Sequence, residues 1–141
     1  MTQYHIAEGL LTVPEGWDDK TVNVFMKALP SGENASIVVT RDTLSEPLEQ
    51  YVGRTLRGLS QTLPRFSLLA RHERAVGPLT GHELVLRWTR EGSVIHQQQV
   101  YVEYFGRVLT FTLTAPLAGA EEAKRVFGEV LDEVKLRKPG S

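Results

Sequence analysis

The stretch from Val94 to Ala115, VIHQQQVYVEYFGRVLTFTLTA, constrains the fold more than any other part of the sequence. It predicts two long β-strands joined by a tight turn at residues 105–107, because apolar and polar side chains alternate along both halves. Successive side chains of a strand point to opposite faces, so the alternation defines two unlike faces. One is a plain core face, made of Val100, Val102, Leu109, Phe111, Leu113 and Ala115. The other mixes apolar groups with uncharged hydrogen-bonding groups: Ile95, Gln97, Gln99, Tyr101, Val108, Thr110, Thr112 and Thr114. A mixed face of this kind is suited to a partner that is both apolar and able to form hydrogen bonds.

The rest of the chain predicts further strands and two amphipathic helices. The expected strands cover residues 4–7, 10–13, 21–29, 35–41, 66–76 and 82–90, and the expected helices cover 46–63 and 118–134. Ser45 is the expected N-cap of the first helix, with Pro47 in its first turn. Each helix has one apolar stripe that must be buried against a sheet. The simplest architecture is an α+β fold, a twisted antiparallel sheet with helices packed on it. If both helices cover one face, the mixed face is concave and open.

Length and composition indicate one globular domain, residues 1–141. The net charge is −1 and the pI is about 6.4, which argues against a nucleic-acid partner. The chain has no cysteine, so disulfides and thiolate chemistry are excluded. We find neither an export signal nor a stretch of about 18 apolar residues, and therefore expect a cytoplasmic protein that is not inserted in a membrane.

The sequence offers little that predicts catalysis. The four histidines, His5, His72, His82 and His96, stand in no metal-binding spacing, and cysteine is absent as a ligand. A GxSxG nucleophile motif and a glycine-rich phosphate loop are also missing. We therefore expect no enzyme activity, no metal and no cofactor.

Two polar patterns admit more than one interpretation. The run from Gln97 to Gln99 fits either a solvent-exposed strand edge or a groove whose amides meet an incoming segment. The Val22/Val24 row and the row of Ser36, Val38 and Thr40 repeat the mixed character; they also fit β-branched residues selected for strand propensity.

Several motifs together resemble a known family. They are VPEGWDDKTVNVF, ASIVVTRD, YVGRTLRGLSQTLPRF, WTREGSVIHQQQVYVE and VLTFTLT, in this order. The chain resembles the DUF1795 (DcrB-related) family over residues 4–134, and within it the Eag chaperones of bacterial type VI secretion. The resemblance implies the Mog1/PsbP-like fold. It also implies a homodimer whose concave surfaces bind the transmembrane helices near the N-terminus of a PAAR-containing effector and help to load it on the secretion spike.

The resemblance, carried over position by position, implies a client-binding groove. Its residues are Val22, Val24, Ser36, Val38, Thr40, Thr55, Leu59, Leu63, Ile95, Gln97, Gln99, Tyr101 and Thr110. This chain departs from the family pattern at Thr55, where a glutamine is usual, and at Leu59, where a smaller residue is usual. Leu59 and Leu63 are equally compatible with a place in the core.

Two other functions remain open at this point. The same fold could serve as a different interaction module, such as a subunit of an envelope or regulatory complex. It could also bind a small molecule, for which we would expect a closed pocket near His96 or Glu103 with a perturbed pKa.

Overall fold

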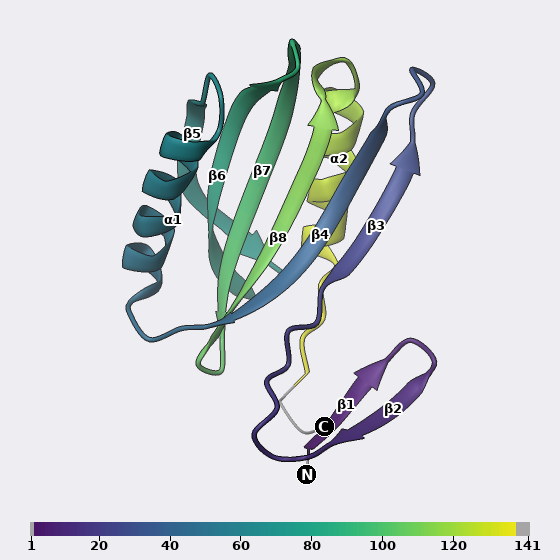
Figure 1. Ribbon diagram of the computed structural model, residues 1–141, viewed down its shortest axis with the longest axis vertical. Coiled ribbons are helices and arrows are strands. Elements are labelled where there is room, and N and C mark those ends of the chain that lie inside the picture. Colours follow the sequence, from purple (N-terminus) through teal and green to yellow (C-terminus); the bar gives the residue numbers. More distant parts are fainter. Residues whose placement is uncertain (1, 138–141) are drawn as a thin grey trace.

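The computed structural model describes residues 2–137, apart from the side chains of Thr2 and His5. The elements are β1 (Thr2–Ile6), β2 (Gly9–Val13), β3 (Asn23–Ala28), β4 (Asn34–Thr43), α1 (Leu48–Thr62), β5 (Ser67–Val76), β6 (Leu79–Arg90), β7 (Ser93–Tyr104), β8 (Arg107–Pro116), the 3-10 turn η1 (Leu117–Gly119) and α2 (Ala120–Asp132). Six strands form one antiparallel sheet in the order β3-β4-β8-β7-β6-β5 (Figure 1). The predicted α+β class with a Mog1/PsbP-like sheet is confirmed.

Strands β7 and β8 lie at the centre of the sheet and present the two predicted faces. Gln99 lies opposite Thr112, and Val100 lies opposite Phe111, so the mixed residues and the core residues sort onto separate sides. The turn at Phe105 and Gly106 has positive φ at both positions, +47° and +75°, which is the geometry of a tight two-residue hairpin. We call the side with Gln99 the groove face and the side with Val100 the reverse face.

Helix α2 covers the reverse face. Phe127 and Leu131 are buried there, and they belong to one apolar core with Val100, Phe111 and Leu113. This side of β8 is entirely apolar, whereas its other side carries threonines at every second position. The larger apolar area is therefore buried when α2 packs on the reverse face.

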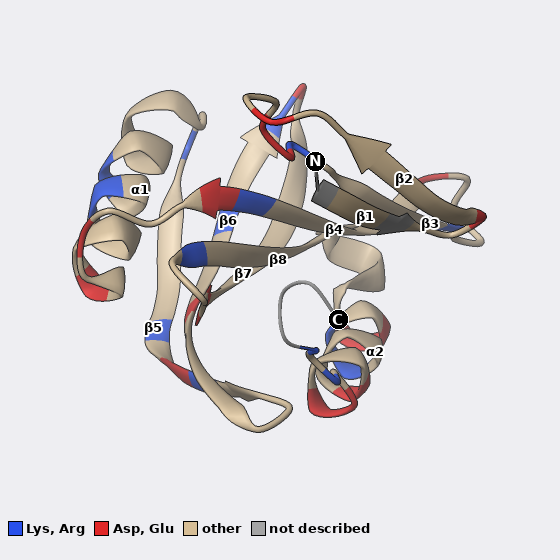
Figure 2. Cartoon of the chain, turned by 90° about the horizontal axis from the view of Figure 1, so that it is seen from below, with Lys and Arg blue, Asp and Glu red and all other residues tan. Residues whose placement is uncertain are grey.

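Helix α1 lies on the groove face, over the β6–β7 part of the sheet. Its side chain Val52 is fully buried and packs in a second core with Leu84, Leu86, Tyr101 and Val108. The chain enters α1 from β4 and leaves it into β5, so this connection passes over the three strands that lie between them. Figure 2 shows that both helices carry their charged residues on their outer sides.

The expectation that both helices cover one face is therefore wrong. α1 and α2 lie on opposite faces, and the groove face is covered over only part of its width. The expected N-cap at Ser45 is also wrong, because α1 begins at Leu48 with Pro47 in the capping position and without a side-chain cap. Neither α1 nor α2 has the length and apolar character that crossing a membrane requires, and they are the α-helices of the described residues.

The first two strands form a separate hairpin. β1 and β2 pair with each other and not with the main sheet. The connecting segment returns to the sheet at Asp19 and Thr21, whose backbone carbonyls accept hydrogen bonds from Arg107 and Arg41, each at 3.2 Å. Beyond this anchor the hairpin projects from the body of the protein (Figure 1).

We expect Leu131→Ala to lower the free energy of unfolding by about 3 kcal/mol, because it leaves a cavity under α2. The neighbouring Val130 is 40% exposed while Leu131 is 0% exposed, so Val130→Ala is a matched control with an expected loss below about 0.5 kcal/mol. Urea unfolding curves measure both. Equal losses would contradict the placement of α2 on the reverse face.

Candidate functional site

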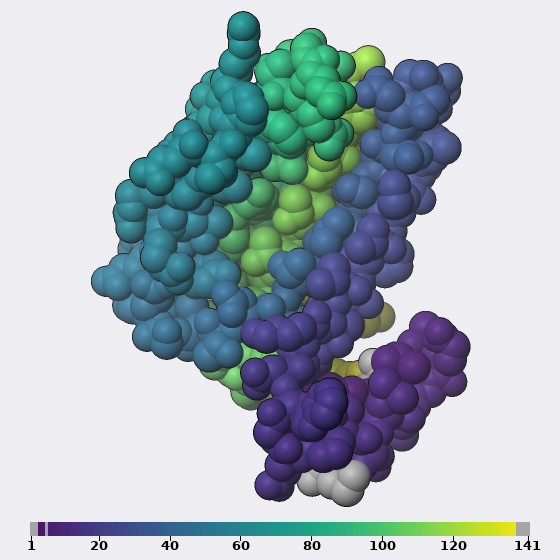
Figure 3. Space-filling model, in the orientation of Figure 1, coloured from purple at the N-terminus to yellow at the C-terminus, as the bar shows by residue number. Residues whose placement is uncertain are grey.

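The uncovered part of the groove face is a trough between α1 and the edge strand β3. Its floor follows the register of the sheet: Val38 lies opposite Thr112, which lies opposite Gln99, and Gln99 lies opposite Leu84 beneath α1. On either side of this row of paired residues, Ser36 lies opposite Thr114 and Thr40 lies opposite Thr110. The space-filling view shows the floor strands recessed between α1 and the β3–β4 side (Figure 3).

Uncharged side chains make the floor. The set is Ser36, Val38, Thr40, Thr110, Thr112, Thr114, Gln97 and Gln99. Most of these side chains are half-buried, so each presents only part of its surface to the trough. A floor without charge accepts apolar groups with little desolvation cost.

A ladder of side-chain hydrogen bonds follows β7. The Gln97 amide donates to the Thr114 hydroxyl at 3.1 Å, and the Gln99 amide donates to Gln97 Oε1 at 3.5 Å. Gln99 Oε1 accepts from the Tyr101 hydroxyl. These bonds fix the orientation of both amides, because their oxygen and nitrogen atoms have different partners.

The hydroxyls nearer the open side have no such partners. Within residues 2–137, the hydroxyl groups of Ser36, Thr40 and Thr112 make no hydrogen bond to the protein. Each can both donate and accept. The floor therefore offers free hydrogen-bonding groups next to the apolar surface of Val38.

Tyr51 and Tyr101 close one end of the trough. The Tyr51 hydroxyl reaches from α1 to Asp42 Oδ2 at the end of β4, at 3.1 Å, and its ring meets Tyr101 edge-on at 6.2 Å. Burial raises the pKa of the Tyr101 phenol far above its usual value, so it remains a hydrogen-bond donor to Gln99. Burial, followed by the neighbouring Asp42 carboxylate, also raises the pKa of Tyr51.

On the helix side of the trough, the expected groove residues Thr55, Leu59 and Leu63 differ in their positions. Thr55 is half-buried and lies one turn after Tyr51, on the side of α1 that faces the trough. Leu59 and Leu63 pack in the core beneath α1. Leu59 and Leu63 therefore hold α1 on the sheet and are not the main lining of the trough.

The opposite rim is formed by β3. Val24 lies opposite Val38 and is 54% exposed, as is Val22, which precedes the strand by one residue. Met26 lies opposite Ser36, is 64% exposed and was not predicted as a groove residue. Met26 continues the alternation of Val22 and Val24 in the sequence, so this pattern alone was enough to predict Met26 as a groove residue.

Ile95 and Tyr101 are buried at 3% and 1% exposure, and Tyr101 belongs to the core beneath α1. Gln99, at 8%, lies at the border between that core and the open floor. Thr112 and Thr114, which share the floor with Thr110, were assigned to the mixed face but not to the groove. Their inclusion follows from the register between β4 and β8.

Behind the floor, the reverse face contains a buried polar chain. Arg87 Nε donates to His96 Nδ1 at 3.3 Å, and His96 Nε2 lies 3.0 Å from Gln98 Oε1. The Gln98 amide donates to Glu83 Oε2 at 3.0 Å, and His72 Nε2 lies 2.6 Å from the other Glu83 oxygen. His96 accepts at one nitrogen and donates at the other, so the chain fits a neutral imidazole.

Among the described side chains, His72, His82 and His96 belong to no metal-binding cluster. In the described residues no three histidine, aspartate or glutamate side chains are close enough to hold an ion, and the His5 side chain lies outside the described residues. The pKa of His96 is lowered, first by burial and then by the nearby Arg87 and Lys124, against the opposing effects of Gln98 and Glu121.

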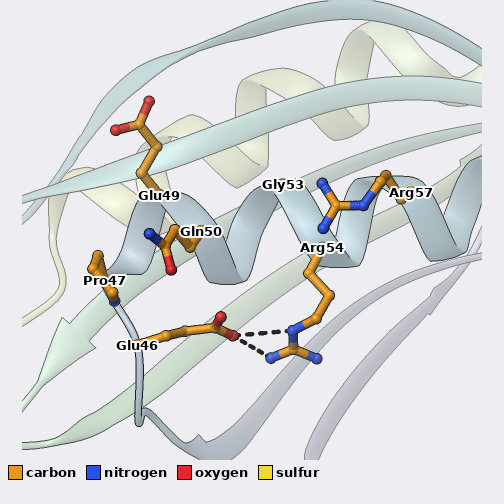
Figure 4. A pocket seen from close by; sticks show the side chains of 7 residues that line it. All are labelled: Glu46, Pro47, Glu49, Gln50, Gly53, Arg54 and Arg57. Carbon is orange, nitrogen blue, oxygen red and sulfur yellow. Dashed lines mark hydrogen bonds and ion pairs between the residues drawn. The ribbon is translucent and has the colours of Figure 1, made fainter.

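A second hollow, of about 470 Å³, lies on the outer side of α1 and its preceding residues (Figure 4). Glu46 and Arg54 pair across it, with Arg54 Nε donating to Glu46 Oε1 at 3.0 Å. Arg57, Glu49 and Gln50 complete an open, charged surface in which no nucleophile and base converge. None of its lining residues belongs to the trough.

Comparison with known proteins identifies similar chains and structures. In Pseudomonas aeruginosa strain PAO1, the protein named Effector EagT6 is 36% identical to this chain in an alignment of length 120 that covers 81% of each protein. The crystal structure of PA94 from Pseudomonas aeruginosa has a TM-score of 0.87 and 29% identity, over 97% of both chains.

More distant structures share the fold alone. LpqN of Mycobacterium tuberculosis gives a TM-score of 0.56 at 14% identity over 85% of both chains. PsbP of Synechocystis sp. PCC 6803 gives 0.52 at 12% identity, over 85% of this chain and 95% of that one. The fold and the trough define a Mog1/PsbP-like domain with a half-open sheet face. The profile of the DcrB family matches residues 8–133, and the chain belongs to this family. The resemblance predicted from the sequence is thereby confirmed.

Acidification should destabilise the protein through His96. Because the folded pKa lies below the ordinary value of about 6.5, the unfolded chain takes up a proton first as the pH falls. The contribution of His96 to the free energy of unfolding is fully present above about pH 6.5, the unfolded pKa, and is lost as the pH falls towards the lowered folded pKa. His96→Gln should therefore reduce the loss of unfolding free energy between neutral pH and about pH 5.

Urea unfolding at several pH values measures this difference, with His82→Gln as the control for a histidine outside the polar chain. An unchanged pH dependence in His96→Gln would contradict the neutral, buried state of His96.

Proposed function

We propose that this protein is a non-catalytic chaperone or adaptor that binds and shields the N-terminal transmembrane helices of a PAAR-containing type VI secretion effector. It would then help to load that effector on the secretion spike. The observation that carries the proposal is the trough itself: an uncharged floor, apolar rims and hydroxyl groups without partners. The name of the relative Effector EagT6 supports a place in effector secretion.

The width of the trough suits one helix. Neighbouring strands lie about 4.8 Å apart, so the uncovered strands β3, β4 and β8 provide a floor roughly 10–15 Å wide. An α-helix with its side chains is about 10–12 Å in diameter. A single helix therefore fits between α1 and the β3 rim.

The chemistry of the floor also suits a transmembrane helix. Burying apolar side chains against Val38, Val24 and Met26 contributes roughly 25 cal/mol per Å² removed from water. Transmembrane helices often expose small and hydroxyl residues where they pack on one another. The free hydroxyls of Thr112 and Ser36 can form the hydrogen bonds that such residues would make with a neighbouring helix.

The proposal includes a homodimer in the cytoplasm and the absence of catalysis. An open apolar trough on a monomer favours aggregation, and both a second copy and a client reduce that exposure. The sequence contains no nucleotide-binding motif, so in this proposal the client is released by competition or by handover to the secretion apparatus and not by hydrolysis.

The variant Val38→Gln/Gln99→Ala should lose capture of the client by at least about tenfold. A polar amide replaces an apolar floor contact, and the fixed Gln99 amide is removed. The measurement is co-purification with the N-terminal transmembrane segment of a PAAR effector expressed in the same cells. Val94→Gln is the matched control, because Val94 is also a β-strand valine but lies outside the trough.

Gln99→Ala removes the acceptor of the Tyr101 hydroxyl, so Val38→Gln alone is measured beside it and urea unfolding confirms that each variant is folded. Full capture by folded variants would contradict the trough as the binding site. Capture of a soluble, folded partner in place of the transmembrane segment would favour a different interaction module.

A further inference from the structure

Positive charge is concentrated in one part of the sequence, where arginine alone carries it. Residues 51–100 contain seven arginines, three acidic residues and no lysine, whereas the remaining 91 residues have a net charge of −5. Arginine presents a planar fork of N–H donors that matches a carboxylate or a phosphate, and lysine does not. This composition indicates that the segment recognises an anionic group.

Three of the seven arginines have no partner for their side chains. The other four have the following contacts: Arg54 with Glu46, Arg74 with Asp132, Arg87 with His96, and Arg90 over the Trp88 ring. Within residues 2–137, the guanidinium groups of Arg57, Arg65 and Arg71 form neither a hydrogen bond nor an ion pair.

Arg57 and Arg71 come together at Gly53. Gly53 and Arg57 belong to α1, and each is two residues from Thr55, which is a turn of roughly 200° around the helix. They therefore lie on the side of α1 that faces away from the trough. Arg71 reaches the same side from β5, because it lies opposite Leu84, which is buried beneath α1. We call Gly53, Arg57 and Arg71 the arginine flank.

The two guanidinium groups of the arginine flank border one small space. A Cβ atom at Gly53 would lie 3.8 Å from Arg57 Nη1 and 4.0 Å from Arg71 Nη2, so both nitrogens lie within 4.0 Å of the same point. Like charges repel each other, and no carboxylate of the described residues neutralises either arginine. Figure 4 shows Glu49 directed away from Arg57. A carboxylate from outside can accept charge-assisted hydrogen bonds of about 2.8 Å from both arginines.

We propose that the arginine flank and the hollow beside it bind an acidic segment of a second protein, with one aspartate or glutamate carboxylate held between Arg57 and Arg71. The hollow of about 470 Å³ along α1 includes Gly53 and Arg57 in its lining and has room for further side chains of that segment. The inference goes beyond the proposed function, because the arginine flank and the trough lie on opposite sides of α1.

The surroundings favour a peptide carboxylate over a nucleic acid. Glu46 and Glu49 line the hollow, and Glu73 lies two residues from Arg71 on the same side of β5. These carboxylates repel a continuous polyanion such as DNA, whereas a segment with separated single charges can direct its carboxylate to the two arginines. The Gln50 amide also lines the hollow without a side-chain partner in the described part of the chain, and it can bind the backbone of a peptide.

The position of the arginine flank allows one chain to hold two partners. With a transmembrane helix in the trough, as proposed above, the client contacts α1 on the side of Thr55. The acidic segment contacts the same helix at Gly53 and Arg57, so neither occupant blocks the other. The acidic partner can therefore bind a chaperone that already carries its client.

NMR of the full chain, with nitrogen-15 in the backbone and the arginine side chains, tests the site. The probe is a peptide of alternating glutamate and serine, and the control peptide has glutamine in place of every glutamate. We expect the glutamate peptide to shift the Nε resonances of Arg57 and Arg71 and the Gly53 amide, and to bind more weakly as the salt concentration rises. The glutamine peptide should shift none of them.

Arg57→Gln and Arg71→Gln should each weaken binding of the glutamate peptide at least about fivefold, because each removes charge-assisted donors. Arg65→Gln is the matched control, since Arg65 is also exposed and without a partner in residues 2–137 but lies beyond the end of α1. Its effect should stay below about twofold. Client capture by the trough should be unchanged in all three variants, so failure of this inference and failure of the proposed function give different results.

Two substitutions at Gly53 separate charge from shape. Gly53→Glu and Gly53→Gln fill the same space, but only the glutamate places a carboxylate beside Arg57, one turn later in the helix. We expect Gly53→Glu to weaken binding of the glutamate peptide at least about fivefold more than Gly53→Gln.

The inference would be overturned by a wild type that binds neither peptide, by equal binding of the two peptides, or by equal binding to the two Gly53 variants. Full binding by Arg57→Gln or Arg71→Gln would contradict it too. Inorganic phosphate and a short DNA duplex are titrated in parallel, and stronger binding of either one at the arginine flank would replace the acidic segment as the partner.

Discussion

The difference between the two faces of β8 determines how the rest of this protein is arranged. Leu109, Phe111 and Leu113 make one side entirely apolar, and α2 must cover it. Thr110, Thr112 and Thr114 make the other side half-polar, so burying it under a helix would contribute less. Helix α2 covers the apolar side of β8 on the reverse face, and α1 covers the groove face only over β6 and β7. The uncovered remainder is the trough, and its polarity is a direct consequence of the threonine positions.

Much of this fold could be predicted from the sequence, because strands and helices follow local periodicity. The hairpin of β7 and β8, its turn and its two faces were all predicted from alternation alone. The side of the sheet on which each helix packs depends on strand order, which no local pattern contains. The register places Leu84 beside Gln99 and Leu86 beside Gln97, so both leucines lie on the groove face. Helix α1 packs on that face because these leucines are there. The start of α1 was predicted from Ser45, although Pro47 takes the capping position.

The candidate site was predictable in part for the same reason. Val38, Ser36 and Thr40 come together with Thr110 through the register, as the mixed pattern suggested. Ile95 and Tyr101 share that pattern but are buried, and Tyr101 lies beneath α1. The sequence of a strand does not indicate where a helix will cover it. Met26, which continues the Val22 and Val24 alternation, was omitted despite a clear signal.

Protection of a single engineered thiol measures occupancy of the trough most directly. Thr112→Cys would place the only thiol of the chain on the floor, and Thr80→Cys would place it on an exposed strand position outside. If a transmembrane helix lies in the trough, alkylation of Thr112→Cys should slow strongly in the purified client complex, while alkylation of Thr80→Cys keeps its rate. Equal alkylation of Thr112→Cys in the free protein and in the complex would contradict the account.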